Sequence, residues 1–275
     1  MFAVLYVLER DKDWLAAFRE RFKPAQPVIY SVGVKSGAPF FKVKVKETRN
    51  GIPWQSVKSI CGRLSQKLLL TKDIQLPEKY DMDVFVPEVL PARLIFNCAA
   101  ETLSRCAAKT SQLSVCIVDK KGVLSQFIDN IVMYATTIKI VTKDVCSYSI
   151  VASEIMDKFG ATLIIDDNIK LAQDCTVVIT TDISMLSGKE EGIIFAPSNT
   201  CEGSFKNVVS GEGVNMPTEY QELLPEGIEP LLFASALHEL CGVDTLGNCY
   251  FQKLMIDLTP SNTYDVAKLI SKVVK

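Results

Sequence analysis

Residues 113–182 read LSVCIVDKKGVLSQFIDNIVMYATTIKIVTKDVCSYSIVASEIMDKFGATLIIDDNIKLAQDCTVVITTD. Apolar runs of strand length alternate in this stretch with longer amphipathic runs of helix length. The alternation predicts βαβ units and a parallel sheet. We expect four parallel strands with helices between them, the first helix spanning Val123–Tyr134.

The rest of the chain extends this α/β pattern in both directions. Downstream we expect strands at 192–197 and 207–210 and helices at 228–241 and 264–274. Upstream we expect strands at 2–8, 28–34, 41–46 and 83–86, and helices at 11–22 and 54–69. The upstream order β-α-β-β-α-β resembles a compact, ferredoxin-like domain. The predicted organisation is an N-terminal α/β domain at 1–90, a connecting helix at 91–110 and a Rossmann-like domain at 111–275.

The composition is that of an ordinary globular protein, and the net charge argues against two classes of binding partner. Of the 275 residues, 48% are hydrophobic and 23% charged, and the net charge is −2. Without a basic excess, neither nucleic acid nor an anionic membrane is an expected partner. No apolar run is long enough to span a bilayer. Nine scattered cysteines and a single histidine favour free thiols in the cytoplasm over disulfides or a zinc site.

The loop after the first strand of this stretch lacks the glycines of a dinucleotide site. In the motif G-x-G-x-x-G, the glycines permit a tight turn, a close approach of the pyrophosphate and tight helix–strand packing. Here the three positions fall on Asp119, Lys121 and Leu124, and Gly122 is out of register. We expect Leu124 to push helix and strand apart and the Asp119 carboxylate to repel a pyrophosphate. Lys120, Lys121 and the N-terminus of the helix would still attract an anion.

The remainder of the unit resembles two families of Rossmann-like enzymes, the shikimate-dehydrogenase-like and methylene-tetrahydrofolate-dehydrogenase-like groups. The segment IKIVTKD is similar to their second strand, after which a polar or basic residue meets the ribose or its 2′-phosphate. Thr142 and Lys143 occupy that place. The segment LAQDCTVVITTD is similar to their fourth strand, which ends under the nicotinamide ribose, here at Thr181 and Asp182. The resemblance implies a Rossmann-like fold over roughly 113–242, and it is architectural, with no motif intact.

Two further polar segments follow predicted strands. Ser198, Asn199 and Thr200 come after the fifth strand, at the carboxyl edge where open α/β sheets bind ligands. The glycine-rich segment 210–215 is either a loop around a ligand or a plain turn.

We therefore expect a two-domain α/β protein with a degenerate phosphate loop. The leading hypothesis is a non-catalytic role, in which the carboxyl edge of the sheet binds a small anionic ligand or a partner protein. The alternative is an NAD(P)-dependent oxidoreductase of the shikimate-dehydrogenase-like type, with NAD or NADP as cofactor. That alternative needs a proton-transferring residue, for which the resemblance implies a lysine–aspartate pair, and the first domain offers no clear candidate.

Overall fold

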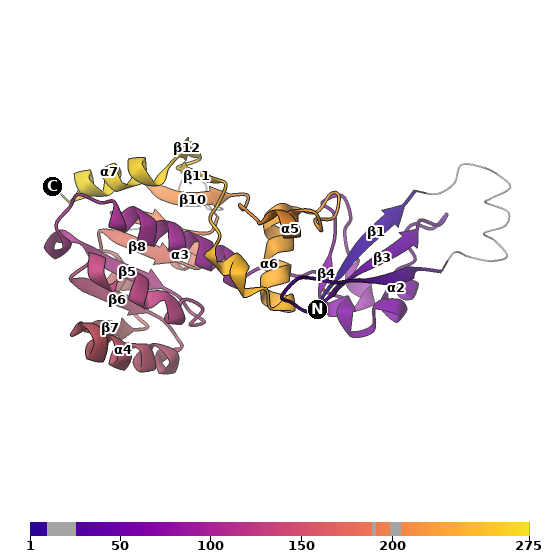
Figure 1. Ribbon diagram of the computed structural model, residues 1–275, viewed down its shortest axis with the longest axis horizontal. Coiled ribbons are helices and arrows are strands. Elements are labelled where there is room, and N and C mark those ends of the chain that lie inside the picture. Colours follow the sequence, from indigo (N-terminus) through magenta and orange to yellow (C-terminus); the bar gives the residue numbers. More distant parts are fainter. Residues whose placement is uncertain (10–25, 189–190, 199–204, 275) are drawn as a thin grey trace. The chain divides into compact units, whose positions relative to one another are not determined.

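The chain folds into two compact units. The computed structural model describes residues 1–9, 26–188, 191–198 and 205–274, and Figure 1 labels its helices and strands. Unit 1 comprises 1–87 and 216–246, and unit 2 comprises 88–215 and 247–275. This division differs from the predicted one, in which 111–275 forms a single domain. The predicted helix at 11–22 lies outside the described residues.

Unit 1 contains a four-stranded mixed sheet in the order β2-β3-β1-β4. Its strands are β1 (Ala3–Leu8), β2 (Val28–Val32), β3 (Phe40–Lys46) and β4 (Leu68–Leu69). β1 runs parallel to both β3 and β4, and only β2 is antiparallel to its neighbour β3. The ferredoxin-like expectation is therefore wrong, because that arrangement is antiparallel throughout.

The helix predicted at 54–69 is shorter in the structure. α2 (Trp54–Cys61) ends at Gly62, whose φ of 53° breaks the helical path. The 3₁₀ helix η1 (Gly62–Gln66) follows and leads into β4, and a further 3₁₀ helix, η2, spans Glu78–Tyr80. The strand predicted at 83–86 is reduced to one bridge, between Val84 and Leu68.

Aromatic packing explains why residues 216–246 return to unit 1. The rings of Phe2 and Phe40 stack with centroids 5.1 Å apart, and Phe233 packs edge-on against both, at 6.1 and 5.4 Å. Phe233 belongs to α6 (Pro230–Cys241), which ends as predicted at Gly242 in the left-handed conformation. The short helices α5 (Thr218–Gln221) and η8 (Asp244–Asn248) flank it. Sequence periodicity identifies α6 as a helix but carries no information about which sheet its apolar face covers.

Unit 2 is organised around an eight-stranded sheet in the order β12-β11-β10-β9-β8-β5-β6-β7. Its strands are β5 (Ser114–Val118), β6 (Thr137–Val141), β7 (Leu163–Asp166), β8 (Val177–Thr180), β9 (Ile193–Phe195), β10 (Val208–Glu212), β11 (Lys253–Ile256) and β12 (Thr259–Ser261). β5 to β10 pair in parallel, which confirms the four parallel strands predicted within 113–182. The order of these six strands is that of a Rossmann-like fold.

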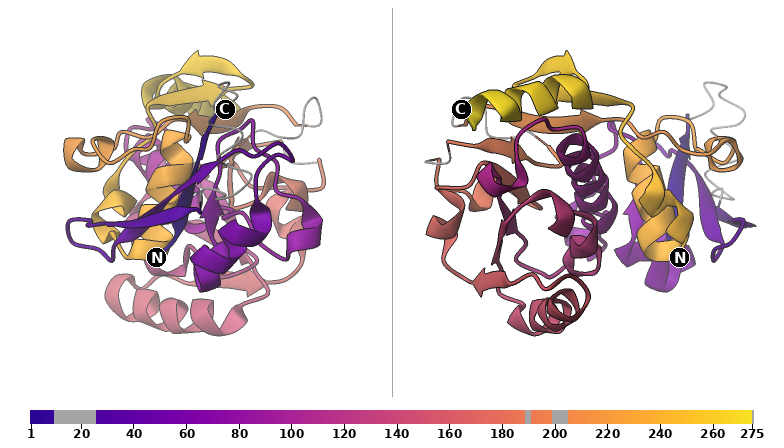
Figure 2. Two further views of the ribbon diagram at one scale, coloured as in Figure 1. Left: turned by 90° about the vertical axis from the view of Figure 1, so that its right-hand side faces the viewer. Right: turned by 60° about the vertical axis from the view of Figure 1, so that its left-hand side comes forward.

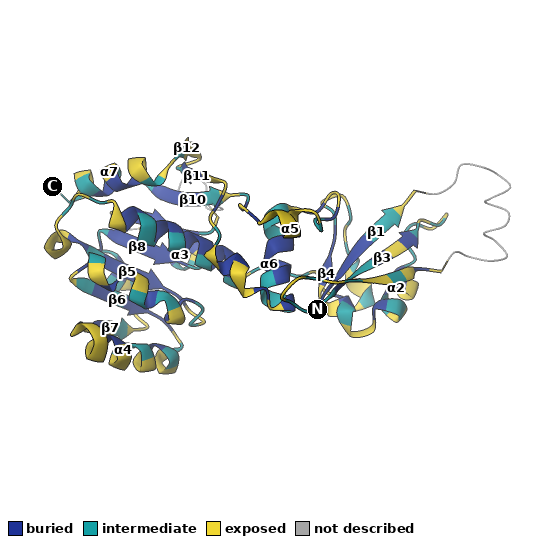
Figure 3. Cartoon of the chain, in the orientation of Figure 1, coloured by how far each residue is buried: buried dark blue, intermediate teal, exposed yellow. Residues whose placement is uncertain are grey.

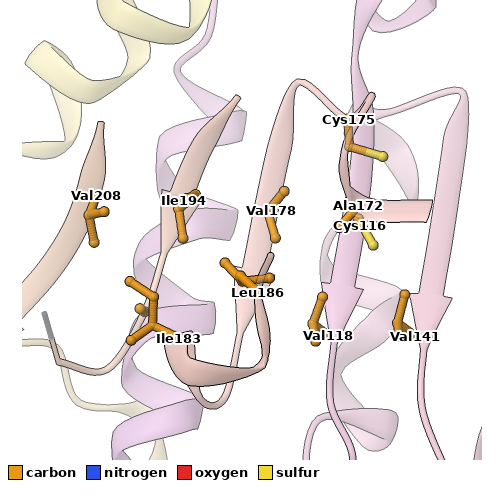
Figure 4. Packing of buried hydrophobic residues seen from close by; sticks show 11 residues of the cluster. Cys116, Val118, Val141, Ala172, Cys175, Val178, Ile183, Leu186, Ile194 and Val208 are labelled. Carbon is orange, nitrogen blue, oxygen red and sulfur yellow. The ribbon is translucent and has the colours of Figure 1, made fainter. Parts of the chain in front are cut away.

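Helices cover the large sheet on both faces. α3 (Val89–Ser104) contacts β8 and β9 and packs against α7 (Thr263–Val273), as the views in Figure 2 show. The opposite face carries a buried cluster that includes Cys116, Val118 and Val178, shown in Figure 4. The 3₁₀ helices η6 (Ile169–Ala172) and η7 (Ile183–Met185) pack there, and another, η3 (Thr110–Gln112), precedes β5. No helix within the described ranges is long and apolar enough to cross a lipid bilayer.

α4 (Val145–Phe159) packs against β7 at the edge of the sheet. Only Tyr148 and Ile155 of this helix are buried, and its outer side is exposed in Figure 3. Its N-cap is the Asp144 side chain, which accepts the backbone N–H of Ser147 at 3.3 Å.

The helix predicted at Val123–Tyr134 is replaced by two 3₁₀ helices, η4 (Ser125–Asn130) and η5 (Val132–Tyr134). Backbone hydrogen bonds there join residues three apart, such as Phe127 N to Leu124 O at 3.0 Å. The predicted apolar side is nevertheless buried, because Leu124, Ile128 and Ile131 are fully enclosed. Apolar spacing therefore located the buried face but did not distinguish a 3₁₀ helix from an α-helix.

The sequence reading missed the hairpin of β11 and β12. The two strands are antiparallel to one another, and β11 is also antiparallel to β10. The connecting residues Asp257 and Leu258 both have positive φ, 47° and 69°, as a tight hairpin turn of this kind requires. Because Asp-Leu is not one of the usual turn pairs such as Asn-Gly, this hairpin has no recognisable turn signal in the sequence.

Gly211 lies in strand β10, so the glycine-rich segment 210–215 is part strand and part loop. Its first three residues belong to β10 and pair with β11. A Cβ at Gly211 would lie 2.1 Å from the ring of Phe251, so the glycine makes room for that ring. Its role is to leave space for the Phe251 ring beside the pair of strands β10 and β11.

We expect Gly211→Ala to destabilise the protein by about 1–3 kcal/mol through overpacking against the ring. The same substitution in a Phe251→Ala background should cost much less, because the ring is absent. Gly33→Ala is the matched control, since nothing lies within 4 Å of its added Cβ. Chemical denaturation of the four variants measures the effect. An equal cost of Gly211→Ala in both backgrounds would contradict this explanation of the glycine.

Candidate functional site

The candidate site lies at the carboxyl edge of the large sheet, where the strand order reverses at β5. Thr181 N donates to Val118 O at 3.1 Å, and Asp119 N donates to Val141 O at 2.9 Å. The segments that follow β5, β6 and β8 are thus side by side, and open α/β sheets bind ligands at such a point. The structure brings together three predicted groups of residues: 119–122, 142–143 and 181–182.

Asp119 is the centre of the loop that follows β5. Its side chain is completely buried. Oδ2 accepts the backbone N–H of Leu124 at 2.7 Å and the hydroxyl of Tyr148 at 2.8 Å, and Oδ1 accepts the N–H of Lys121 at 3.3 Å. The carboxyl group of Asp119 therefore points inward and is satisfied by the loop and by Tyr148, instead of standing open toward a ligand.

This arrangement resembles an anion site that is already occupied. In a glycine-rich phosphate loop, backbone N–H groups point at a bound phosphate. Here the N–H groups of Lys121 and Leu124 are directed to the chain's own carboxyl group. Burial, together with the charge and the hydrogen bond of Asp119, raises the pKa of Tyr148 well above its usual value, so this tyrosine stays a hydrogen-bond donor.

The other residues of the loop have structural partners. Lys121 Nζ pairs with Glu88 Oε2 at 2.6 Å on the surface, an interaction that contributes about 1 kcal/mol or less. Gly122 has a φ of 74°, and an added Cβ would lie 2.6 Å from Oδ2 of Asp144. Lys120 is exposed. Since 3₁₀ helices of six and three residues follow, no α-helix begins here, and the expected anion-attracting helix N-terminus is absent from this part of the described chain.

The residues after β6 divide into a structural threonine and an exposed lysine. Thr142 is 2% exposed, and its Oγ1 accepts the N–H of Asp144 at 3.0 Å. Lys143, the next residue, is exposed. Thr142 therefore supports the cap of α4, whereas the side chain of Lys143 is available at the surface.

The residues after β8 form a compact turn. Thr180 is fully buried, and its hydroxyl donates to Asp182 O at 2.8 Å and accepts Asp182 N at 3.1 Å. The carboxylate of Asp182 accepts Ser184 N at 2.9 Å and so caps η7. Thr181, between them, is half-buried. Asp182 is exposed, so it combines this capping role with access to solvent.

The predicted ligand-binding segment 198–200 is only partly described. Ser198 follows β9 and is exposed, whereas Asn199 and Thr200 lie outside the described residues.

His238 lies near the end of α6. Its Nδ1 is 3.0 Å from Val243 O, so the ring contacts the backbone just after the helix ends.

Two residues of the site escaped the sequence reading. Tyr148 lies 29 positions from Asp119, and no local pattern connects a tyrosine in a helix with a carboxyl group after a strand. Asp144 could have been found, since an aspartate immediately before an amphipathic run is a typical N-cap.

Comparison with known proteins gives no family for this chain. No family model and no curated protein matches the chain. A solved structure, L-tryptophan dehydrogenase from Nostoc punctiforme, aligns with 99% of this chain and 80% of its own at 12% identity and a TM-score of 0.30. The strand order assigns the fold: the chain has a mixed α/β architecture with a Rossmann-like, mainly parallel sheet.

We expect the contacts of Asp119 to be major contributors to stability. Asp119→Ala leaves two N–H groups and the Tyr148 hydroxyl unsatisfied in the interior, which should cost about 3–5 kcal/mol. Tyr148→Phe removes one hydrogen bond to the carboxyl group and should cost about 1.5–3 kcal/mol. Tyr264→Phe, at a tyrosine that is 57% exposed, is the control and should change little.

Chemical denaturation measures these differences in the free energy of unfolding. In a double-mutant cycle, the costs of the Asp119 and Tyr148 substitutions should not add, because the two side chains share a hydrogen bond. Additive costs, or a neutral Asp119→Ala, would show that the carboxyl group does not organise the loop.

Proposed function

We propose that this chain is a non-catalytic, Rossmann-like ligand-sensing protein whose phosphate loop does not accept a dinucleotide. The observation that carries the proposal is the occupation of the loop by Asp119, whose carboxyl group accepts Lys121 N and Leu124 N. A pyrophosphate would have to displace this buried group and take over its hydrogen bonds. It would also meet a carboxylate, and two like charges at close range repel one another.

The ligand we propose is a small anion bound beside residues 119–124. We call these residues the sealed loop, because Asp119 accepts the backbone N–H groups of Lys121 and Leu124. Lys120 and Lys143 are both exposed and follow β5 and β6, which are adjacent strands. Neither ammonium forms an ion pair with a carboxylate of the described residues. The alternative ligand is a partner protein that presents an acidic surface to the two lysines. The cytoplasmic location is a separate prediction.

The first test is titration with NAD and NADP by isothermal calorimetry. We expect no saturable binding below about millimolar concentration, which corresponds to a binding free energy weaker than about −4 kcal/mol. Micromolar binding of either dinucleotide would overturn the sealed-loop proposal and would make the oxidoreductase alternative the better one.

The second test asks whether the two lysines bind anions. Thermal shifts should be measured with phosphate, pyrophosphate and citrate, at constant ionic strength, for the wild type and for Lys120→Gln/Lys143→Gln. A stabilising anion should lose most of its effect in the double variant, because a ligand at a hundred times its Kd adds about 2.7 kcal/mol only where it binds. Lys272→Gln, which removes an exposed positive charge on α7, should leave the shift unchanged. Equal shifts in all variants would exclude these lysines as the site.

A further inference from the structure

Unit 1 contains a cavity of about 1120 Å³ at the carboxyl ends of its parallel strands. The segments that follow β1, β3 and β4 contribute Glu9, Glu47 and Asp73 to its lining. Open α/β sheets bind ligands outside this end of their strands. The volume is sufficient for a small molecule, since such sites usually measure about 300–1,000 Å³. Position and size are therefore those of a small-molecule site.

One wall of the cavity is a stretch of β1 without a strand partner. β4 pairs with β1 only as far as Val4, and no other described strand lies on that side of β1. Glu47 N donates to Leu8 O at 3.0 Å, which directs the even-numbered residues of β1 toward β3. The N–H and C=O of Val7 therefore face the cavity side, because successive residues of a strand alternate in direction. Neither group has a hydrogen-bond partner among the described residues, so both are available to a ligand.

Part of the lining is apolar and aromatic. Trp54, at the start of α2, is 6% exposed and belongs with Leu5 to the buried core of unit 1. Ile52, Ile74 and Tyr80 pack against the same core and also line the cavity. Such a surface binds the apolar part of a ligand, and the faces of aromatic rings attract cations.

The segment that returns from residue 216 closes another side of the cavity. It contributes Glu226 and Gly227 to the lining. Gly227 has a φ of 76°, and an added Cβ would lie 2.8 Å from Cγ2 of Thr71, in the loop after β4. The glycine thus permits a close approach of the two segments, which places Glu226 beside that loop.

Negative charge predominates around the cavity. The carboxylates of its lining are Glu9, Glu47, Asp73 and Glu226. Its two lysines have partners, because Lys72 Nζ lies 3.7 Å from Glu229 Oε2 and Lys79 Nζ lies 5.0 Å from the centre of the Tyr80 ring. The three glutamates of the lining form no ion pair within the described chain. Clefts lined by charge of one sign attract ligands of the opposite sign.

We propose that this cavity of unit 1 binds a small organic cation, in which an ammonium or guanidinium group is carried on an apolar or aromatic body. The carboxylates and the C=O of Val7 would accept hydrogen bonds from the cationic group, and the aromatic lining would contact the body. Across the described residues, no three His, Cys, Asp or Glu side chains come together as metal ligands would, so an organic cation fits the site better than a metal ion. The proposal concerns unit 1 and does not rest on the proposed function.

Titration of the full chain with tryptamine and with agmatine tests the proposal. Calorimetry at constant pH and ionic strength should show saturable binding of at least one of the two cations. Indole propionate, which joins the ring system of tryptamine to a carboxylate in place of the ammonium, should not bind. Failure of both cations to saturate the protein at about millimolar concentration would overturn the proposal, as would equal affinities for tryptamine and indole propionate.

Variants and a backbone probe then locate the site. Glu47→Gln/Glu226→Gln should weaken binding of the cation about tenfold or more, because two charged acceptors are lost. Glu222→Gln removes an exposed carboxylate of unit 1 outside the cavity and should leave the affinity unchanged. In NMR spectra of the wild type, the amide signal of Val7 should move during the titration. Equal affinities of the two variants, or a Val7 signal that does not move at saturation, would exclude the cavity as the binding site.

Discussion

The buried carboxyl group of Asp119 is the interaction on which the carboxyl edge of unit 2 depends. It joins the end of β5, the N–H groups of the following loop and the Tyr148 hydroxyl on α4. A buried carboxyl group is tolerated only when its oxygens are satisfied, and here both are. The anchoring of Leu124 N to this group holds the start of the next segment against the strand, and that segment continues as 3₁₀ helix instead of α-helix.

The same interaction underlies the proposed function. A glycine loop keeps its N–H groups for a ligand, whereas this loop directs two of them to an aspartate of its own chain. These contacts stabilise the loop, and they are the basis of our proposal that it does not bind a phosphate group. This exchange is why we place the proposed ligand on the neighbouring exposed lysines and not inside the loop.

The two ends of the parallel strands in the large sheet carry different polar contacts. The carboxyl edge carries the sealed loop, with Asp119 satisfied by hydrogen bonds. At the amino-terminal edge, Lys139 Nζ and the thiol of Cys175 both donate to Leu171 O, at 3.3 Å each. Both arrangements bring together groups that are distant in sequence.

Apolar periodicity in the sequence was enough to determine the parallel strands of unit 2, the helix ending at Gly242 and the positions of the candidate residues at strand ends. These features are local, because each depends on side chains a few positions apart. Tertiary structure alone decided the inward direction of Asp119, the partnership with Tyr148, the return of α6 to unit 1 through Phe233, and the role of Gly211 beside Phe251. Each of these depends on contacts between distant segments, and a single sequence carries no record of which distant side chain will fill a given space.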